Sequence, residues 1–270
     1  MRPLADMPEM DAQRVRLVLT DIDDTLTADG RLPADAYRAL EDLFNAGFLV
    51  APVTGRPAGW CDMIARFWPV TGVVGENGAL YFAYQPALRT MQRVYAADFS
   101  TRAANRLRLE MIKTRVLAEV PGCAVSADQA YREADLAIDF CEDVPPLDLQ
   151  AVDRIKAIFE EEGAVAKVSS IHVNGWFGQY DKLSMTRRFA REIAGLDIDK
   201  DNESIAFVGD SPNDAPMFAF FRNAFGVSGV RNFIGRLDAE PTYVTKGGGG
   251  SGFVEVAERL LSARKGMAAA

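Results

Sequence analysis

The stretch that decides the fold is LVLTDIDDT, residues 17–25. Its first four residues are apolar or β-branched, which predicts a buried strand of a parallel sheet. Asp21 and Asp23 follow where that strand should end, and open α/β sheets bind ligands at the carboxyl ends of their strands. Two carboxylates at such an edge are costly to bury without a cation between them, and Mg²⁺ takes oxygen ligands. An Asp-rich turn after a strand is the alternative interpretation.

The composition is that of a globular protein and limits the classes of function. The chain has 270 residues, of which 49% are hydrophobic and 25% charged, with a net charge of -8. This acidic balance argues against a nucleic-acid partner, but a local lysine and a metal can still attract a phosphorylated substrate. No apolar run approaches the roughly 18 residues of a membrane span, and residues 1–14 lack the apolar core of a signal peptide.

Histidine and cysteine usage narrows the chemistry further. The chain has one histidine, His172, which argues against Ser-His-Asp hydrolases and multi-histidine zinc enzymes. The three cysteines, Cys61, Cys123 and Cys141, match no zinc or redox spacing and predict a reduced, cytoplasmic setting. Hydrolysis would therefore have to use carboxylates, lysine and a hard metal.

Strand and helix patterns alternate from residue 15 onward and predict a right-handed parallel sheet. The expected elements are strands at 16–21, 48–53 and 71–74 and helices at 34–46 and 58–68. After residue 178 the alternation resumes, with helices at 182–193, 215–221 and 252–264 and strands at 204–209, 223–227 and 242–245. The glycine run at 247–250 is typical of a flexible surface loop before the last helix.

The pattern between these two parts is different and predicts an inserted α+β domain. It contains long helical patterns at 100–120 and 147–162, short strand patterns at 123–126 and 136–140, and a hairpin-like pair of strands at 164–173. We therefore expect a core made of residues 1–86 and 178–270, and an insertion at 87–177.

Polar residues follow four expected elements of the core. They are Asp21 with Asp23, Thr54, Lys182, and Asp210 with Asp214. The carboxyl ends of parallel strands meet at one edge, so we expect these side chains to converge. Phosphoryl transfer needs such a set: a nucleophile, an acid/base, a metal site and donors for phosphate charge.

These motifs resemble those of a known superfamily. DIDDT at 21–25, TGR at 54–56, Lys182 and GDSPND at 209–214 resemble, in this order, the four motifs of the haloacid dehalogenase (HAD) superfamily. The resemblance covers nearly the whole chain. The insertion resembles the α+β cap of the Cof-like, type IIB sugar phosphatases, and GENGA at 75–79 resembles a segment typical of that branch. The resemblance implies an α/β fold with a Rossmann-like parallel-sheet core and an inserted α+β cap that sets specificity.

The resemblance also implies roles for the carboxylates. Asp21 matches the nucleophile that forms an aspartyl-phosphate, and Asp23 matches the general acid/base. The carboxylates of Asp21 and Asp210 and the backbone carbonyl of Asp23 match the ligands of Mg²⁺, with Asp214 as the acidic partner of the metal site. 

The remaining motif residues match the phosphate and substrate contacts. Thr54 and Lys182 match the clamp on the phosphate and count with the catalytic residues, while Gly55, Arg56 and Asn213 are expected to bind substrate.

Plainer interpretations exist for several of these residues. Thr54 could simply end a strand, Lys182 could be an exposed lysine at a helix start, and Asp214 could cap a helix. Arg56 could form a salt bridge at the surface. His172, Trp176 and Tyr180 lie near the return from the insertion and could line a pocket, although packing is favoured for Trp176.

Two positions depart from the family pattern. Asp24 stands where the family often has glycine, and Leu183 follows Lys182 where many relatives have glycine. Aspartate tolerates turn geometry, so we expect Asp24 to leave the chemistry intact. Leu183 is expected to affect the geometry of the loop around Lys182.

The sequence thus predicts a Mg²⁺-dependent phosphatase acting on a small phosphorylated metabolite, a sugar phosphate or a related polyol or glycerate ester. A phosphomutase related to phosphomannomutases is the first alternative, because it uses the same scaffold and Asp pair. A non-catalytic metabolite sensor is the second, and it would be expected to have a broken motif. Neither a nucleic-acid partner nor a membrane is expected.

Overall fold

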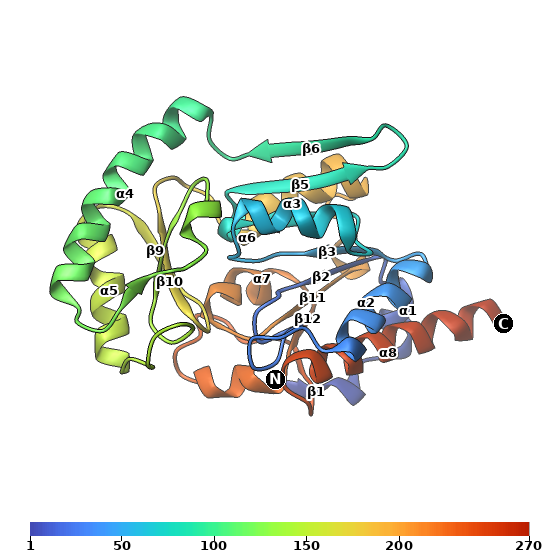
Figure 1. The fold of residues 1–270 in the computed structure, drawn as a ribbon. Helices are drawn as coiled ribbons and strands as arrows, with labels where there is room; N and C mark the ends of the chain where they lie inside the picture. The colour runs from blue at the N-terminus through green and yellow to red at the C-terminus, as the bar shows by residue number, and fades with distance from the viewer. Residues whose placement is uncertain (270) are drawn as a thin grey trace.

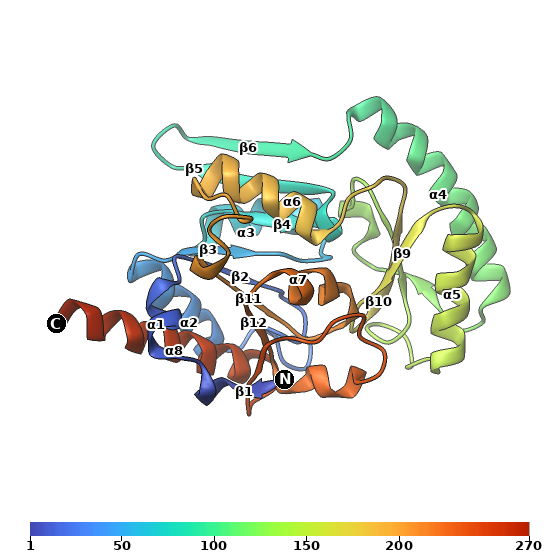
Figure 2. The same ribbon diagram turned by 180° about the vertical axis from the view of Figure 1, so that it is seen from behind.

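The computed structural model describes the backbone of residues 1–269 and the side chains of residues 1–266, and it contains two bodies (Figures 1 and 2). The larger body, the core, is built on a six-stranded sheet whose neighbouring strands are all parallel. In spatial order its strands are β1 (Arg2–Pro3), β13 (Tyr243–Val244), β12 (Asn223–Gly226), β11 (Ile205–Gly209), β2 (Leu17–Thr20) and β3 (Leu49–Pro52). The expected parallel α/β core is confirmed.

Helices cover both faces of this sheet, which explains why β2 is buried along its whole length. Four helices lie on the face seen in Figure 1: α1 (Glu9–Arg14), α2 (Ala34–Asn45), α3 (Ala58–Phe67) and α8 (Gly249–Ala269). Two lie on the face seen in Figure 2: α6 (Lys182–Phe189) and α7 (Ala215–Phe220). The spacing of Ala36, Leu40 and Leu43 places these buried side chains on one side of α2, as its sequence predicts.

A three-stranded antiparallel sheet extends the core beyond β3. It contains β4 (Val73–Gly75), β5 (Leu80–Gln85) and β6 (Thr90–Tyr95), and a parallel bridge between Val53 and Val74 joins it to the end of β3. The boundary expected at residue 87 falls in the turn of the β5–β6 hairpin. Because β6 pairs with β5 along its whole length, this strand stays with the core, and the second body begins after residue 95.

The second body is an α+β unit at one end of the core (Figure 1). Its antiparallel sheet has the order β7 (Ala124–Val125), β8 (Leu136–Asp139), β10 (His172–Trp176) and β9 (Val165–Val168). Helices α4 (Phe99–Glu119) and α5 (Leu149–Glu161) cover the face of this sheet that points away from the core. Both helices begin at an aspartate whose side chain accepts a backbone N–H bond, Asp98 and Asp148.

The sequence did not predict β1, α1, β5 or β6. β1 has only two residues, which is too short for a periodic pattern, and it is defined by its pairing with β13. None of the described helices is long and apolar enough to cross a membrane.

The glycine run at 247–250 is not the flexible loop that we expected, because α8 already begins at Gly249. A Cβ atom on Gly249 would collide with the carbonyl oxygen of Thr27, and one on Gly250 would lie 2.8 Å from that of Leu26. Gly249 also has a φ of +51°, which favours glycine. These glycines therefore let the start of α8 pack against the segment that follows the Asp21–Asp23 motif.

Replacing Gly249 with alanine should therefore destabilise the fold. We expect Gly249→Ala to lower the free energy of unfolding by on the order of 1–3 kcal/mol, since the new Cβ meets backbone in a left-handed conformation. Gly229→Ala is the matched control, because a Cβ there meets nothing within 4 Å. Urea unfolding of both variants measures the difference, and equal midpoints would support a flexible loop instead.

Candidate active site

Three buried carboxylates meet at the carboxyl edge of the parallel sheet. Strands β2 and β11 pair in register with Thr20 opposite Val208, so Asp21 and Asp210 follow neighbouring strand ends. Oxygens of Asp21, Asp210 and Asp214 lie within 4.8 Å of one another, and all three residues are buried. The structure therefore brings together three of the aspartates that the sequence singled out.

Lys182 is the cation of this cluster. Its Nζ lies 2.7 Å from Asp214 Oδ1 and 3.1 Å from Asp21 Oδ1, and its side chain is only 1% exposed. The alternative of an exposed lysine is therefore wrong. Gly78 makes room for this approach, because a Cβ atom there would collide with the carbonyl oxygen of Asp181. Asp181 in turn caps α6, whose first residue is Lys182.

The carboxylate of Asp214 is fully used within the chain. Oδ1 contacts Lys182, while Oδ2 accepts hydrogen bonds from the backbone N–H of Asp210 at 3.0 Å and of Ser211 at 3.4 Å. The helix-cap interpretation holds in part, since the bond from Ser211 closes a capping box at the short turn before α7. Asp214 thus holds both Lys182 and the backbone next to the Asp210 carboxylate.

The charge balance of the cluster fits a divalent cation. Burial raises the pKa of Asp21 to about 8 although Lys182 opposes the shift, and burial likewise raises the pKa of Asp210 well above its usual range. Asp21 Oδ1 accepts no well-aligned hydrogen bond from any described residue. Asp21 and Asp210 thus have oxygen atoms that a hard cation such as Mg²⁺ could bind, and Thr25 Oγ1 orients Asp210 through a 3.1 Å hydrogen bond.

Hydrogen-bond donors lie beside the carboxylates. Thr54 is fully buried and its Oγ1 accepts a 3.0 Å bond from the Arg56 N–H, which leaves the hydroxyl proton free to donate. Asn213 Nδ2 donates to Asn77 Oδ1 at 3.3 Å, and Asn77 Nδ2 is buried without a partner within residues 1–266. Gly55 contributes its carbonyl to Arg132 at 2.8 Å. Asn77 is a candidate site residue that we missed, and its place in GENGA was the available signal.

The Asp23 side chain points to a different partner from that of Asp21. Arg56 Nη2 lies 2.8 Å from Asp23 Oδ1, and Arg56 Nε lies 3.0 Å from both carboxylate oxygens. Two carboxylates of the second body, Asp128 and Glu142, bind the same guanidinium. Arg56 therefore forms salt bridges, but it is buried, so the surface interpretation is wrong. The sequence offered no local signal for Asp128 or Glu142.

The two departures from the family pattern have simple structural consequences. Asp24 has a φ of +53°, the conformation that glycine would adopt without strain, and Asp24 N donates to Thr27 Oγ1 at 2.9 Å. Leu183 packs against the apolar layer under α6 and α7.

The aromatic residues near the return from the second body differ in role. Trp176 is buried, stacks on Tyr180 at a centroid distance of 5.7 Å and donates to its carbonyl at 3.2 Å, so it packs as expected. His172 is also buried, and its Nε2 lies 2.9 Å from Glu142 Oε2.

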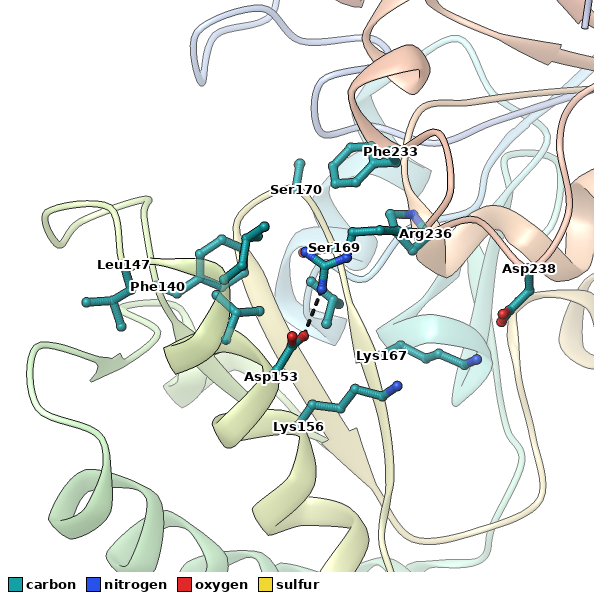
Figure 3. Close-up of a pocket in the computed structure, with 14 residues that line it drawn as sticks. Phe140, Leu147, Asp153, Lys156, Lys167, Ser169, Ser170, Phe233, Arg236 and Asp238 are labelled. Atoms are coloured by element: carbon teal, nitrogen blue, oxygen red, sulfur yellow. Dashed lines mark hydrogen bonds and ion pairs between the residues drawn. The ribbon is translucent and has the colours of Figure 1, made fainter.

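A cavity of about 200 Å³ lies between the second body and the core, beside the turn at residues 212–214 (Figure 3). Lys156 of α5 and Lys167 of β9 line it from one side, and Arg236 crosses it to Asp153 at 2.7 Å. The cavity lies next to the carboxylate cluster but does not contain it, because Pro212 is its only lining residue from the four motifs.

Glu76 joins the two bodies next to the site. Its buried carboxylate accepts backbone N–H bonds from Ala58 in the core and from Glu133, Ala134 and Asp135 in the second body. Burial raises the pKa of Glu76 to about 7, with the Asp135 charge adding to the effect. GENGA thus provides both this connection through Glu76 and the amide of Asn77.

Replacing Glu76 with glutamine should weaken that connection. The amide end of glutamine cannot accept, so at least one N–H loses its partner, and we expect a loss of on the order of 1–3 kcal/mol in the free energy of unfolding. The control is Glu133→Gln, which removes the charge of a partly exposed pair with Arg102 at 3.4 Å and keeps the Glu133 backbone N–H, so it should change little. Urea unfolding at about pH 8.5, above the raised pKa, measures both variants. Equal stability would show that the connection contributes nothing.

Comparisons with known proteins support the fold. No family model matches the chain. A phosphoglycolate phosphatase of Thermoplasma volcanium is 27% identical over 208 residues, covering 76% of this chain and 81% of the relative. A HAD/COF-like hydrolase from Plasmodium vivax has a TM-score of 0.66 at 14% identity, covering 94% of this chain and 99% of the other. A HAD subclass IIB sugar phosphatase has a TM-score of 0.60 at 13% identity, covering 94% and 99%.

These two solved structures share the fold, and the curated relative shares sequence along most of the chain. The chain is therefore similar in sequence to a phosphoglycolate phosphatase over most of its length, and it has the fold of solved HAD-type hydrolases, with the four motifs in order at one sheet edge.

Proposed function

We propose that the protein is a Mg²⁺-dependent phosphatase that hydrolyses a small phosphorylated metabolite, a sugar phosphate or a related polyol or glycerate ester, through an aspartyl-phosphate. The observation that carries this proposal is the placement of Asp21 at the end of β2, with Lys182 Nζ at 3.1 Å. A carboxylate can attack a dianionic phosphate only where nearby cations offset the repulsion. 

The residues of the chain divide the reaction between them. An Asp21 oxygen forms a bond to phosphorus while the bond to the leaving oxygen breaks, and Asp23 gives that oxygen a proton. Asp23 then takes a proton from the water that attacks phosphorus, and the bond to Asp21 breaks to release phosphate. Lys182, Thr54 and Asn77 would donate to the phosphate oxygens, since Lys182 lies beside Asp21, the Thr54 hydroxyl proton is free and Asn77 Nδ2 has no partner among residues 1–266.

When bound, Mg²⁺ would neutralise charge on the phosphate oxygens. The carboxylates of Asp21 and Asp210 and the backbone carbonyl of Asp23 would hold it, with Asp214 positioning Lys182 and the backbone at Asp210. 

The second body would act as the cap that selects the substrate. Residues 96–177 provide the carboxylates of Asp128 and Glu142, which bind Arg56 of the core. They also provide the backbone N–H groups of residues 133–135, which donate to Glu76 of the core. Such a cap would exclude water from the reaction and contact the leaving group. A cytoplasmic location remains our prediction from the cysteine content.

Asp21→Asn should abolish turnover while keeping the size of the side chain. We expect a loss on the order of 10⁴-fold or more in phosphate release, because the amide cannot attack phosphorus. Asp35→Asn, at an exposed position of α2, is the control. Asp21→Asn keeping about a tenth of wild-type release would remove Asp21 from the mechanism. Retention of phosphate on the substrate by the wild type would instead indicate the phosphomutase.

Activity should also depend on a hard divalent cation. We expect a chelator to abolish phosphate release and Mg²⁺ to restore it, whereas Zn²⁺ suits an all-oxygen site less well. Asp210→Asn should raise the Mg²⁺ concentration for half-maximal activity by about tenfold or more, because it removes a charged oxygen from the site. Full activity in excess chelator would contradict the metal assignment.

A further inference from the structure

Three carboxylates enclose the guanidinium group of Arg56. Asp23 binds its Nε and Nη2, Glu142 binds Nη2 at 2.5 Å and Nη1 at 3.3 Å, and Asp128 binds Nη1 at 3.3 Å. The ring of Trp60 covers one face of the guanidinium, with its centroid 4.5 Å from the central carbon. All the donors of Arg56 are therefore already used by the chain.

Glu142 is held in place from several sides. Its backbone N–H and those of Cys141 and Asp143 donate to the buried Asp139 carboxylate at 2.8–2.9 Å, which fixes the loop after β8. His172 Nε2 lies 2.9 Å from Glu142 Oε2. Burial opposes ionisation, but the hydrogen bonds from His172 and Arg56 outweigh it and lower the pKa of Glu142 to about 2. Glu142 is thus a fixed negative charge at neutral pH.

The other cations near Asp23 are paired as well. Lys182 lies between Asp21 and Asp214, and Arg132 lies between Asp128 and Asp135. Among the described residues on the Arg56 side of Asp23, three carboxylates, those of Asp23, Asp128 and Glu142, therefore share one guanidinium. A neutral hydroxyl can donate to these carboxylates, whereas a second carboxylate would meet like charge.

The chemistry fixes where the leaving group must lie. Asp23 can protonate the ester oxygen only within hydrogen-bond reach of it. In phosphoglycolate the carboxylate is one carbon away from that oxygen, so it must lie beside Arg56 and Glu142. Lys156 and Lys167, in the cavity between the two bodies, cannot bind the carboxylate of so short a leaving group instead, because neither Asp23 nor Arg56 lines that cavity.

We propose that Glu142, supported by Asp128, makes this site select leaving groups that bear hydroxyls and reject those that bear a carboxylate next to the ester carbon. This inference rests on the proposed phosphatase function and narrows its substrates, since it removes glycolate and glycerate 2-phosphates from them. It also separates this chain from the Thermoplasma relative, which is named for phosphoglycolate.

Two esters that differ only in this feature test the inference. In 2-hydroxyethyl phosphate a CH₂OH group replaces the carboxylate of phosphoglycolate. For the wild-type protein with Mg²⁺, kcat/KM should be at least about tenfold higher for the hydroxyethyl ester, as like-charge contact predicts. Glu142→Gln keeps the shape and a hydrogen bond to Arg56 but removes the charge, so the ratio should fall by about tenfold. Glu133→Gln, the matched cap control, should leave the ratio unchanged.

Each ester is also measured as a competitive inhibitor of p-nitrophenyl phosphate hydrolysis, which compares the binding of the two esters even if their turnover is slow. Glu142→Ala serves as a second variant if Glu142→Gln does not fold. A wild-type preference for phosphoglycolate, or a ratio that Glu142 variants do not change, would overturn the inference. Absence of phosphate release from every ester, p-nitrophenyl phosphate included, would instead overturn the proposed function.

Discussion

The rest of the structure depends on the cost of burying three carboxylates at one sheet edge. Asp21, Asp210 and Asp214 are all 4% exposed or less, and Lys182 is the one cation in direct contact with them among the described residues. A buried cluster with more negative than positive charge destabilises the fold unless a further cation binds to it or some of its carboxyl groups are protonated. The register of β2 with β11 places Asp21 beside Asp210. The absence of a side chain at Gly78 lets the backbone before Lys182 approach closely.

The core and its motifs could be predicted because their signals are local. A buried parallel strand is a continuous apolar run, and an aspartate directly after it must lie at the carboxyl edge. Asp21, Asp210 and Lys182 therefore converge as the sequence predicts. The glycines at 247–250 were misinterpreted because the sequence does not distinguish a flexible glycine from one in close contact with backbone. Gly249 is of the second kind, since it lies against the carbonyl oxygen of Thr27.

The contacts across the two bodies could not be predicted, for a different reason. Arg56, Asp128 and Glu142 are far apart in sequence, and only the position of the second body over the core brings them together. Each is a charged residue of a type that is usually exposed, and a buried salt-bridge network leaves no periodic pattern in the sequence. The same holds for Glu76, whose side chain accepts N–H groups from a loop almost 60 residues away.

The way in which the two bodies are joined explains this division. Among the described residues, the apolar cluster of the second body contains only residues 109–177, so the two bodies do not share an apolar core there. They are joined instead by buried polar contacts such as those of Glu76, Arg56 and Arg132, which are strong only where water is excluded. A substitution among these contacts would change the charge beside Asp23 without altering the apolar packing inside either body. Under the proposed function, the chemistry would remain constant in the core, where motifs reveal it, while selectivity would vary at positions of the second body such as Asp128 and Glu142, which no motif marks.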